Sequence, residues 1–246
     1  MKFFSLLLFL SLSISGYSQI SVGPSHIGKS KKFNKGALEK FRNTETIFVL
    51  SETLDRYDYF KILEASWTIT PYQIVHISDF DIEKYLSDNY SFATLDGFLR
   101  TIGKGPSSYS TLFTFIGLKM YDHEKILKKL EKLSPEKREK KKMEIAEEHA
   151  SYFSHIYIYP KDEFIHTAAT KNMDNIFTSM YLDDVFYNYK PGYLKNYFQK
   201  VNDQLENEEE YWLYENDYLP ELKNLSLKTL YIPSYLSIRA VKNFII

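Results

Sequence analysis

Residues 46–77 constrain the fold of this chain more than any other stretch, because two β-prone runs flank one amphipathic helix. TIFVL (46–50) is an unbroken apolar run, typical of a strand that is covered on both faces. In LDRYDYFKILEASW (54–67) the apolar residues recur mostly at every third or fourth position, as on one face of a helix. YQIVHI (72–77) predicts a second strand after Pro71, which cannot continue a helix. This order predicts a βαβ unit with parallel strands.

The rest of the pattern predicts an α/β or α+β fold, with a mixed central sheet of about five or six strands flanked by helices. Gly117 lies inside an apolar run and predicts a bulge or a close backbone approach. Turn residues are concentrated between 97 and 106, and 172–189 fits either a helix or a pair of strands. Further strands are expected at 90–95, 110–122, 155–160 and 227–236, and helices at 36–41, 78–86, 123–133, 135–152 and 192–208.

The first 18 residues are predicted to be a signal peptide. Lys2 precedes an apolar run at 3–14, and Gly16 and Ser18 are small residues where a signal peptidase requires them. The alternative is a membrane anchor, but the run is shorter than the roughly 20 residues that cross a bilayer. We therefore expect cleavage after Ser18 and an exported, periplasmic or secreted protein with no transmembrane segment in the mature chain.

The remaining chain divides into an arm and one domain. Residues 19–44 are predicted to be a flexible N-terminal arm followed by a short helix, and 45–246 a single globular α/β domain. The charged helical pair 123–152 is expected to be inserted in this domain. Lysines within the pair are interleaved with glutamates, which predicts a solvated face rather than a basic patch.

Composition excludes several classes of function. The chain has no cysteine, which rules out disulfides, thiolate metal sites, a cysteine nucleophile and a lipoprotein anchor. It has 31 Lys and Arg against 32 Asp and Glu, so its charge gives no case for binding nucleic acid. Hydrophobic residues make up 44% of the chain, enough to predict a folded core rather than disorder.

No catalytic, cofactor-binding or metal-binding residues are predicted. The chain lacks GxSxG, GxGxxG and HExxH, and GKGPSS (103–108) lacks the spacing of a phosphate-binding loop. His149 and His155, with Glu148, could form a metal site only if the fold brought them together, so packing and surface roles are preferred for the histidines. Two pairs of neighbouring carboxylates are interpreted as helix caps and loop acids: Asp79 with Asp81, and Asp183 with Asp184.

Aromatic residues are unusually frequent, at 17% of the chain. A core rich in tyrosine and phenylalanine is one explanation. Exposed aromatic side chains that stack on sugars or form a protein interface are the other, since they bury much area at low entropic cost. Four tyrosines of one cluster are the candidate binding residues: Tyr187, Tyr189, Tyr193 and Tyr197.

The segments TIFVL, WTITPYQIV, DIEKYLSDNYSF, KPGYLKNYFQKVNDQL and KTLYIPSYL, in this order, resemble a family of uncharacterised exported proteins of Bacteroidetes-type bacteria. The resemblance covers about Thr46 to Tyr235, and the signal sequence ending near YSQ is similar to theirs. It implies export and supplies no catalytic residues. At the level of the fold, the opening is also similar to periplasmic α/β modules of envelope-assembly lipoproteins, although this chain lacks the lipid-bearing cysteine.

These observations predict a non-catalytic binding or scaffold component of the bacterial cell envelope, with another envelope protein or a glycan as its partner. An exported hydrolase that acts on glycan or peptide is the alternative. A third hypothesis is structural assembly through an open sheet edge, which a long unprotected edge strand would indicate.

Overall fold

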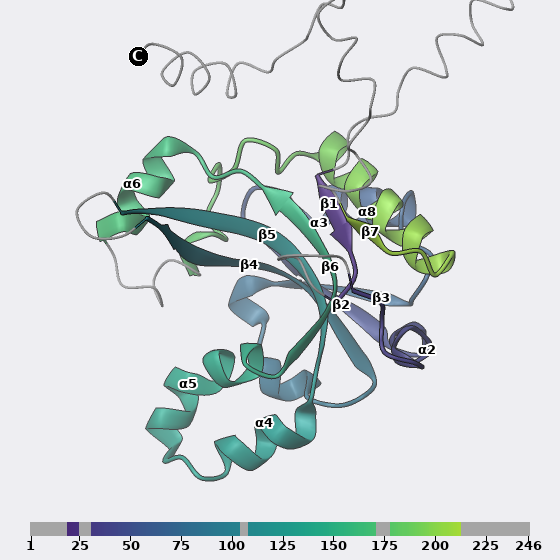
Figure 1. Cartoon of the computed structure of the whole chain (residues 1–246), viewed down its shortest axis with the longest axis horizontal. Coiled ribbons are helices and arrows are strands. Elements are labelled where there is room, and N and C mark those ends of the chain that lie inside the picture. Colours follow the sequence, from purple (N-terminus) through teal and green to yellow (C-terminus); the bar gives the residue numbers. More distant parts are fainter. Residues whose placement is uncertain (1–18, 25–30, 104–107, 171–177, 213–246) are drawn as a thin grey trace, which may run out of the picture.

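The computed structural model describes residues 19–24, 31–103, 108–170 and 178–212. They form a mixed sheet of seven strands in the order β3-β2-β4-β5-β6-β1-β7 (Figure 1). β2 pairs in parallel with both β3 and β4, and the remaining pairs are antiparallel. The strands are β1 (Ile20–Val22), β2 (Glu45–Leu50), β3 (Tyr72–His76), β4 (Tyr90–Ile102), β5 (Tyr109–Tyr121), β6 (Ala150–Ile158) and β7 (Tyr211–Trp212).

The predicted α/β fold and its βαβ opening are confirmed. β2 leads into α3 (Arg56–Glu64), which returns the chain to β3 in parallel register, with Phe48 opposite Ile74. The side chain of Asp55 caps α3 by accepting a hydrogen bond from the amide of Asp58 at 2.7 Å. The sheet has seven strands rather than five or six, because two short strands that the sequence pattern did not show, β1 and β7, extend one side.

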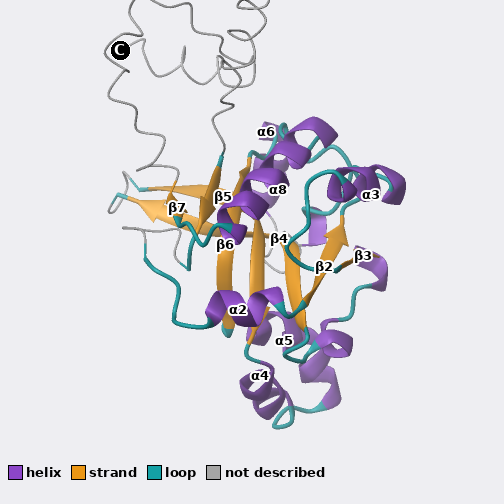
Figure 2. Ribbon diagram, turned by 90° about the vertical axis from the view of Figure 1, so that its right-hand side faces the viewer, coloured by secondary structure: helices purple, strands orange, loops and turns teal. Residues whose placement is uncertain are grey.

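Helices cover both faces of the sheet (Figure 2). On one face, α3 and α8 (Pro191–Glu206) pack over Phe48, whose ring meets Trp67 and Phe198 edge-on at 5.3 Å each. α2 (Ala37–Arg42) joins this layer, and Arg42 donates to the C-terminal carbonyl groups of α8. On the other face lie α4 (His123–Leu130) and α5 (Pro135–Glu147). α6 (Asp162–Thr170) follows β6.

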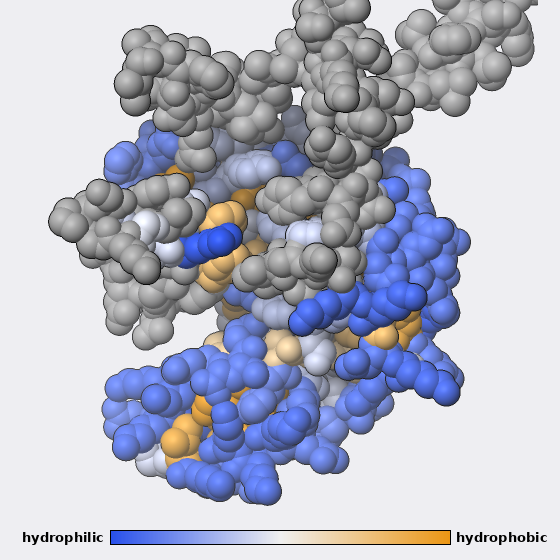
Figure 3. Space-filling view, in the orientation of Figure 1, coloured by the Kyte–Doolittle hydropathy of each residue, from blue (hydrophilic) through white to orange (hydrophobic). Residues whose placement is uncertain are grey.

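The surface of α4 and α5 is mostly hydrophilic, with an apolar strip through it (Figure 3, lower left). Lys140 pairs with Glu136 one helical turn away at 2.9 Å, and Lys129 pairs with Glu148 at 2.7 Å. These lysines therefore interact with acids of the same helical pair, in agreement with the predicted solvated face.

The N-terminal arm is partly ordered, which corrects the expectation of a flexible segment. Ile20 and Val22 are buried in β1, which lies between β6 and β7. The segment ISV alternates apolar and polar residues, and Ser21 lies on the opposite face of the sheet from its neighbours. Three residues give too short a pattern to distinguish a strand from a loop in the sequence, and their pairing partners lie far along the chain.

The helix expected at 78–86 is absent, and two short 3-10 helices take its place. These are η1 (Ile77–Asp79) and η2 (Ile82–Tyr85), separated by two extended residues, Phe80 and Asp81. The partly buried ring of Phe80 packs on Phe92 of β4, and the extended backbone that this contact accompanies interrupts the helix. The side chain of Asp81 then caps η2 by accepting from the amide of Glu83.

Three other boundaries differ from the prediction. β4 continues through 97–102, where turn residues suggested a loop, because each residue pairs with β5 up to Ile102 opposite Tyr109. The predicted helix 135–152 ends at Glu147, and β6 begins at Ala150 rather than at 155. Of the ambiguous segment 172–189, the described residues 178–189 hold only a short helical turn and the bridge between Phe186 and Pro160. The signal peptide and the strand at 227–236 lie outside the described residues.

Candidate functional site

The four candidate tyrosines do not form one exposed face, which corrects that prediction. Tyr189 and Tyr197 are buried at 2% and 6% exposure, and Tyr187 is partly buried. Only Tyr193 is well exposed, at 42%, with its ring stacked on that of Tyr197. Burial raises the pKa of the Tyr189 phenol well above its usual range. The helical periodicity of 193 and 197 was visible in the sequence, but Tyr197 belongs to the inward face of α8 and Tyr193 does not.

The most unusual polar group in the described structure is Lys119, a fully buried lysine in the middle of the sheet. Its ammonium lies 3.1 Å from Asp96 Oδ2 and 2.5 Å from Glu147 Oε1. Tyr121 donates to the same Glu147 oxygen at 2.6 Å, and Tyr152 donates to Asp96. We call these five residues, from β4, β5, β6 and α5, the ionic cluster.

Within the ionic cluster, the charges and hydrogen bonds of its members offset the effect of burial on the pKa of Asp96 and of Lys119. Burial raises the pKa of Asp96, but the Lys119 ammonium and the hydrogen bonds from Tyr152 and the Gly97 amide outweigh burial and hold it below its usual range. Burial lowers the pKa of Lys119, and the carboxylates of Glu147 and Asp96 raise it further than burial lowers it. Burial, followed by the charge of Glu147, raises the pKa of both phenols in the cluster. Lys119, Asp96 and the phenols are therefore held in their ordinary protonation states at neutral pH.

Gly117 makes room for this cluster, but the group that approaches it is a side chain, whereas its position inside a strand predicted a bulge or a close approach of backbone. A Cβ there would lie 2.7 Å from Cε1 of the Tyr152 ring. The β5–β6 register shifts at Leu118 and Lys119, which places Tyr152 opposite Lys119. The close approach and the bulge both occur at this point, and together they aim the Tyr152 hydroxyl at Asp96.

The arrangement of the ionic cluster suits a structural role, the attachment of α5 to the sheet, rather than a catalytic one. Lys119 has no exposed surface that a substrate could reach, and its ammonium is already bound by two carboxylates. Glu147 is the last residue of α5, so the cluster ties this helix to the face of the sheet. Arg138 and Lys142 add a second connection by pairing with Glu83 of η2 and with Asp81, which caps η2.

A second site lies at the outer edge of the sheet, along β3 (Figure 2, right). The carbonyl of Pro71 accepts from the Thr46 amide at 2.8 Å, so residues 71, 73 and 75 direct their backbone groups at β2. By alternation, Tyr72, Ile74 and His76 direct their amide and carbonyl groups outward. Within the described residues no strand pairs with this side of β3. This edge can accept another strand.

Exposed aromatic side chains stand beside this edge. Tyr57 and Phe60, on the outer side of α3, are 64% and 46% exposed. Among the described residues only five large hydrophobic side chains are classed as exposed, and these two are among them. With Tyr72 and Ile74 of β3 they line an open depression of about 760 Å³. Lys61 lies 4.0 Å from the centre of the Tyr57 ring and holds that ring against the helix.

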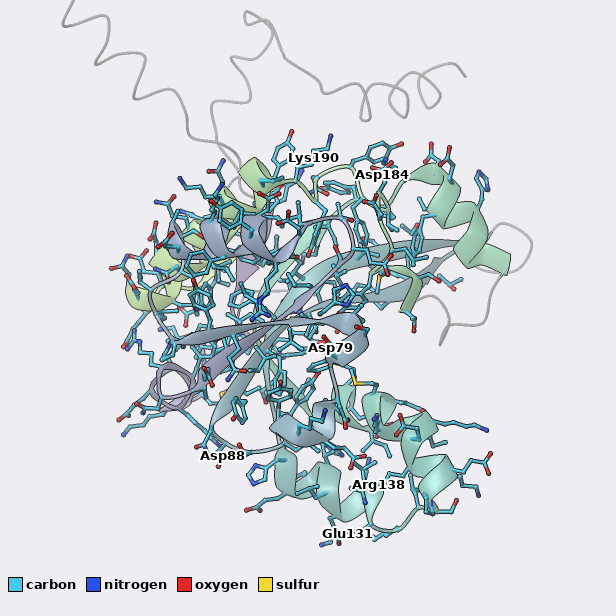
Figure 4. All side chains as sticks on the ribbon, turned by 180° about the vertical axis from the view of Figure 1, so that it is seen from behind. Asp79, Asp88, Glu131, Arg138, Asp184 and Lys190 are labelled. Atoms are coloured by element: carbon cyan, nitrogen blue, oxygen red, sulfur yellow. The ribbon has the colours of Figure 1, made fainter. Side chains whose placement is uncertain are left out.

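A neighbouring depression of about 540 Å³ lies where β3 ends and α3 begins. It shares Ile74 and Arg56 with the first, so the two form a continuous surface, which we call the β3 groove. The second depression is lined by three carboxylates, from Glu52, Asp55 and Asp79. Asp79 lies on the side that faces away in Figure 1 and is labelled in Figure 4. The β3 groove thus has an aromatic end and an acidic end.

The described residues contain no group of three or more His, Asp or Glu side chains placed to hold a metal ion. His149 and His155 do not converge with Glu148 in such a group, and the ring of His155 packs on those of Phe115 and Tyr152. None of the helices within the described ranges has the length and apolar character needed to cross a bilayer.

Comparison with protein-family models, with curated proteins and with solved structures gave no match. Function is therefore inferred from the sequence and the geometry of the chain itself. Sequence reasoning missed both sites. The ionic cluster had a visible signal, since Asp96 and Lys119 are charged residues within apolar, β-prone runs. The β3 groove had none, because which strand lies at the edge depends on the order of strands in the sheet.

Proposed function

We propose that this chain is an exported, non-catalytic binding component of the bacterial cell envelope that captures an extended segment of a partner protein by strand addition to β3. The observation that carries the proposal is the row of outward backbone groups on Tyr72, Ile74 and His76, next to the exposed rings of Tyr57 and Phe60. Main-chain hydrogen bonds to an edge strand supply affinity, and adjacent pockets supply selectivity.

The open edge also bears on how the chain avoids unwanted assembly. Exposed edge strands are usually kept short or protected, because they pair with other chains. β3 has only five residues, and the Gln73 side chain donates a hydrogen bond to Glu45 at 2.8 Å. A short edge of this kind suits the binding of one peptide segment better than extended sheet-to-sheet assembly.

Export is supported by the first 18 residues and is tested separately. Expressed in a bacterial host with its own leader, the protein should be recovered from the periplasm or medium, and its first residue should be Gln19. N-terminal sequencing of the recovered protein measures this directly. Replacing apolar residues of the run at 3–14 with charged ones should retain the full-length chain in the cytoplasm. Recovery of the intact leader on exported protein would contradict cleavage after Ser18.

Strand addition is tested with short peptides selected from a random display library against the chain 19–246. Hydrogen exchange followed by NMR should show fast exchange at the Tyr72, Ile74 and His76 amides in the free protein. These three amides should become protected when a selected peptide is bound. The amides of Gln73 and Val75, which face β2, should exchange slowly in both states.

Ile74→Pro provides the matched variant, because it removes an outward amide and no hydrogen bond to β2. It should bind selected peptides at least about fivefold more weakly, from the loss of a bond worth about 1 kcal/mol. Ile74→Val keeps the amide and should bind as the parent does. If selected peptides bind without protecting the three outward amides, or if none can be selected, the proposed mode of binding is wrong.

A further inference from the structure

We infer that the segment bound along β3 carries an apolar side chain and a lysine or arginine two positions apart. This inference rests on the proposed strand addition and specifies its partner. Alternate residues of an added strand point to the same side of the sheet, about 6.6 Å apart. Those on the α3 side would follow the row of Tyr72, Ile74 and His76, which lies on the same face of the sheet as Phe48.

The two ends of the β3 groove differ in chemistry along this row. The start of β3, at Tyr72, contributes to the depression that includes Tyr57 and Phe60. The end of β3, at His76, contributes to the depression that includes Glu52, Asp55 and Asp79. Ile74 lines both. A peptide residue beside the first depression meets aromatic rings, and the residue two positions further meets carboxylates.

The charge of the acidic end favours a cation. Its three carboxylates face one guanidinium, that of Arg56, which leaves a net charge of −2 when His76 is neutral. The positive end of the α3 dipole does not reverse this preference, because Asp55 already occupies that terminus as its cap. Leu50 and Leu54 line the same depression and can cover the aliphatic stem of a long basic side chain.

The test uses threonine-rich synthetic peptides with Phe and Lys two positions apart, in both orders because the added strand can run in either direction. In matched peptides the lysine is replaced by glutamine or glutamate. Binding to the chain 19–246 is measured by NMR titration at low salt. One of the two lysine peptides should bind about two- to fivefold more tightly than its glutamine counterpart, as exposed ion pairs allow. The glutamate peptide should bind most weakly.

The double variant Glu52→Gln, Asp79→Asn should remove the preference for lysine and leave the glutamine peptide unaffected. Asp55 is kept, since it caps α3. Asp203→Asn, an exposed acid on α8 away from the groove, serves as the control and should preserve the preference. Raising the salt concentration to about 0.5 M should also reduce the difference, because exposed charges are screened.

The outcomes distinguish a failure of this inference from a failure of the proposed strand addition. If selected library peptides protect the β3 amides but lysine, glutamine and glutamate peptides bind equally, strand addition stands and the inference about charge is wrong. Tighter binding of the glutamate peptide would overturn it as well, and would assign Arg56 as the dominant charge. If none of the designed peptides binds while library peptides do, the apolar and basic pattern is wrong. If no peptide of either kind binds, the proposed function fails.

Discussion

Replacing Lys119 with methionine is expected to lower the free energy of unfolding by about 3–5 kcal/mol, the cost of leaving the buried Asp96 and the partly buried Glu147 without their partner. Asp96 and Glu147 would lose the ammonium that lies 3.1 and 2.5 Å from their oxygens. Methionine fills a similar volume, so the effect reports charge rather than a cavity. Chemical denaturation monitored by circular dichroism measures it.

Two comparisons make the Lys119 result specific. Lys140→Met removes an exposed lysine paired with Glu136, and should cost no more than about 0.5 kcal/mol. Adding Asp96→Asn and Glu147→Gln to Lys119→Met should recover part of the loss, because the uncompensated charges are then gone. A Lys119→Met variant as stable as the parent would show that the ionic cluster does not hold α5 to the sheet.

The same variant has a distinct pH dependence. The pKa of Asp96 is lowered in the folded state, so its pairing adds stability above the unfolded value of about 3.9 and loses it as pH falls through the folded value. The pKa of Lys119 is raised, so its contribution is complete below about 10.4 and is lost as pH rises through the folded value. The difference between parent and variant should therefore be greatest between these limits, and shrink below pH 4.

Replacing Phe48 with alanine should cost about 3–5 kcal/mol, as expected when a large buried side chain leaves a cavity. Phe48 is 2% exposed, and its ring contacts Trp67, Tyr72 and Phe198 edge-on, with centroids 5.3 to 6.1 Å apart. These contacts join β2 to β3 and to the helical layer above them. Thermal and denaturant unfolding, compared with the parent chain, give the value.

Phe60→Ala is the matched control for Phe48→Ala. The same substitution is made on α3, where Phe60 is 46% exposed, and it should change stability by less than about 0.5 kcal/mol. It should nevertheless weaken the binding of peptides at the β3 groove. A loss of stability at Phe60 as large as that at Phe48 would mean that the α3 surface is covered in the folded protein, which contradicts an open groove.

The sequence was informative where structure is local. The run at 46–50, the apolar face of α3 and the strand after Pro71 could be recognised, because each pattern repeats within a few residues. The helix expected at 78–86 was wrong because Phe80 is extended and its ring packs on Phe92 of β4, a tertiary contact that the local pattern does not encode. The capping residues indicated where a helical turn begins, but they did not indicate how many turns follow.

Neither site could be predicted in the same way. The pairing of Lys119 with Asp96 depends on the register of β4 with β5 and on a bulge in the β5–β6 pair, which single-strand patterns do not encode. The aromatic cluster misled for a related reason. Tyr189 and Tyr197 belong to the core of a chain with an unusually aromatic interior, and frequency alone did not separate buried rings from exposed ones.

The position of β1 sets the order in which the fold can be completed. Ser21 pairs with His155 on one side and Trp212 on the other, so the first strand to be synthesised finds its neighbours only after most of the chain exists. Closing such long loops is slow compared with local pairing. During synthesis, residues 20–22 therefore remain without sheet partners while β2, α3 and β3 can already associate.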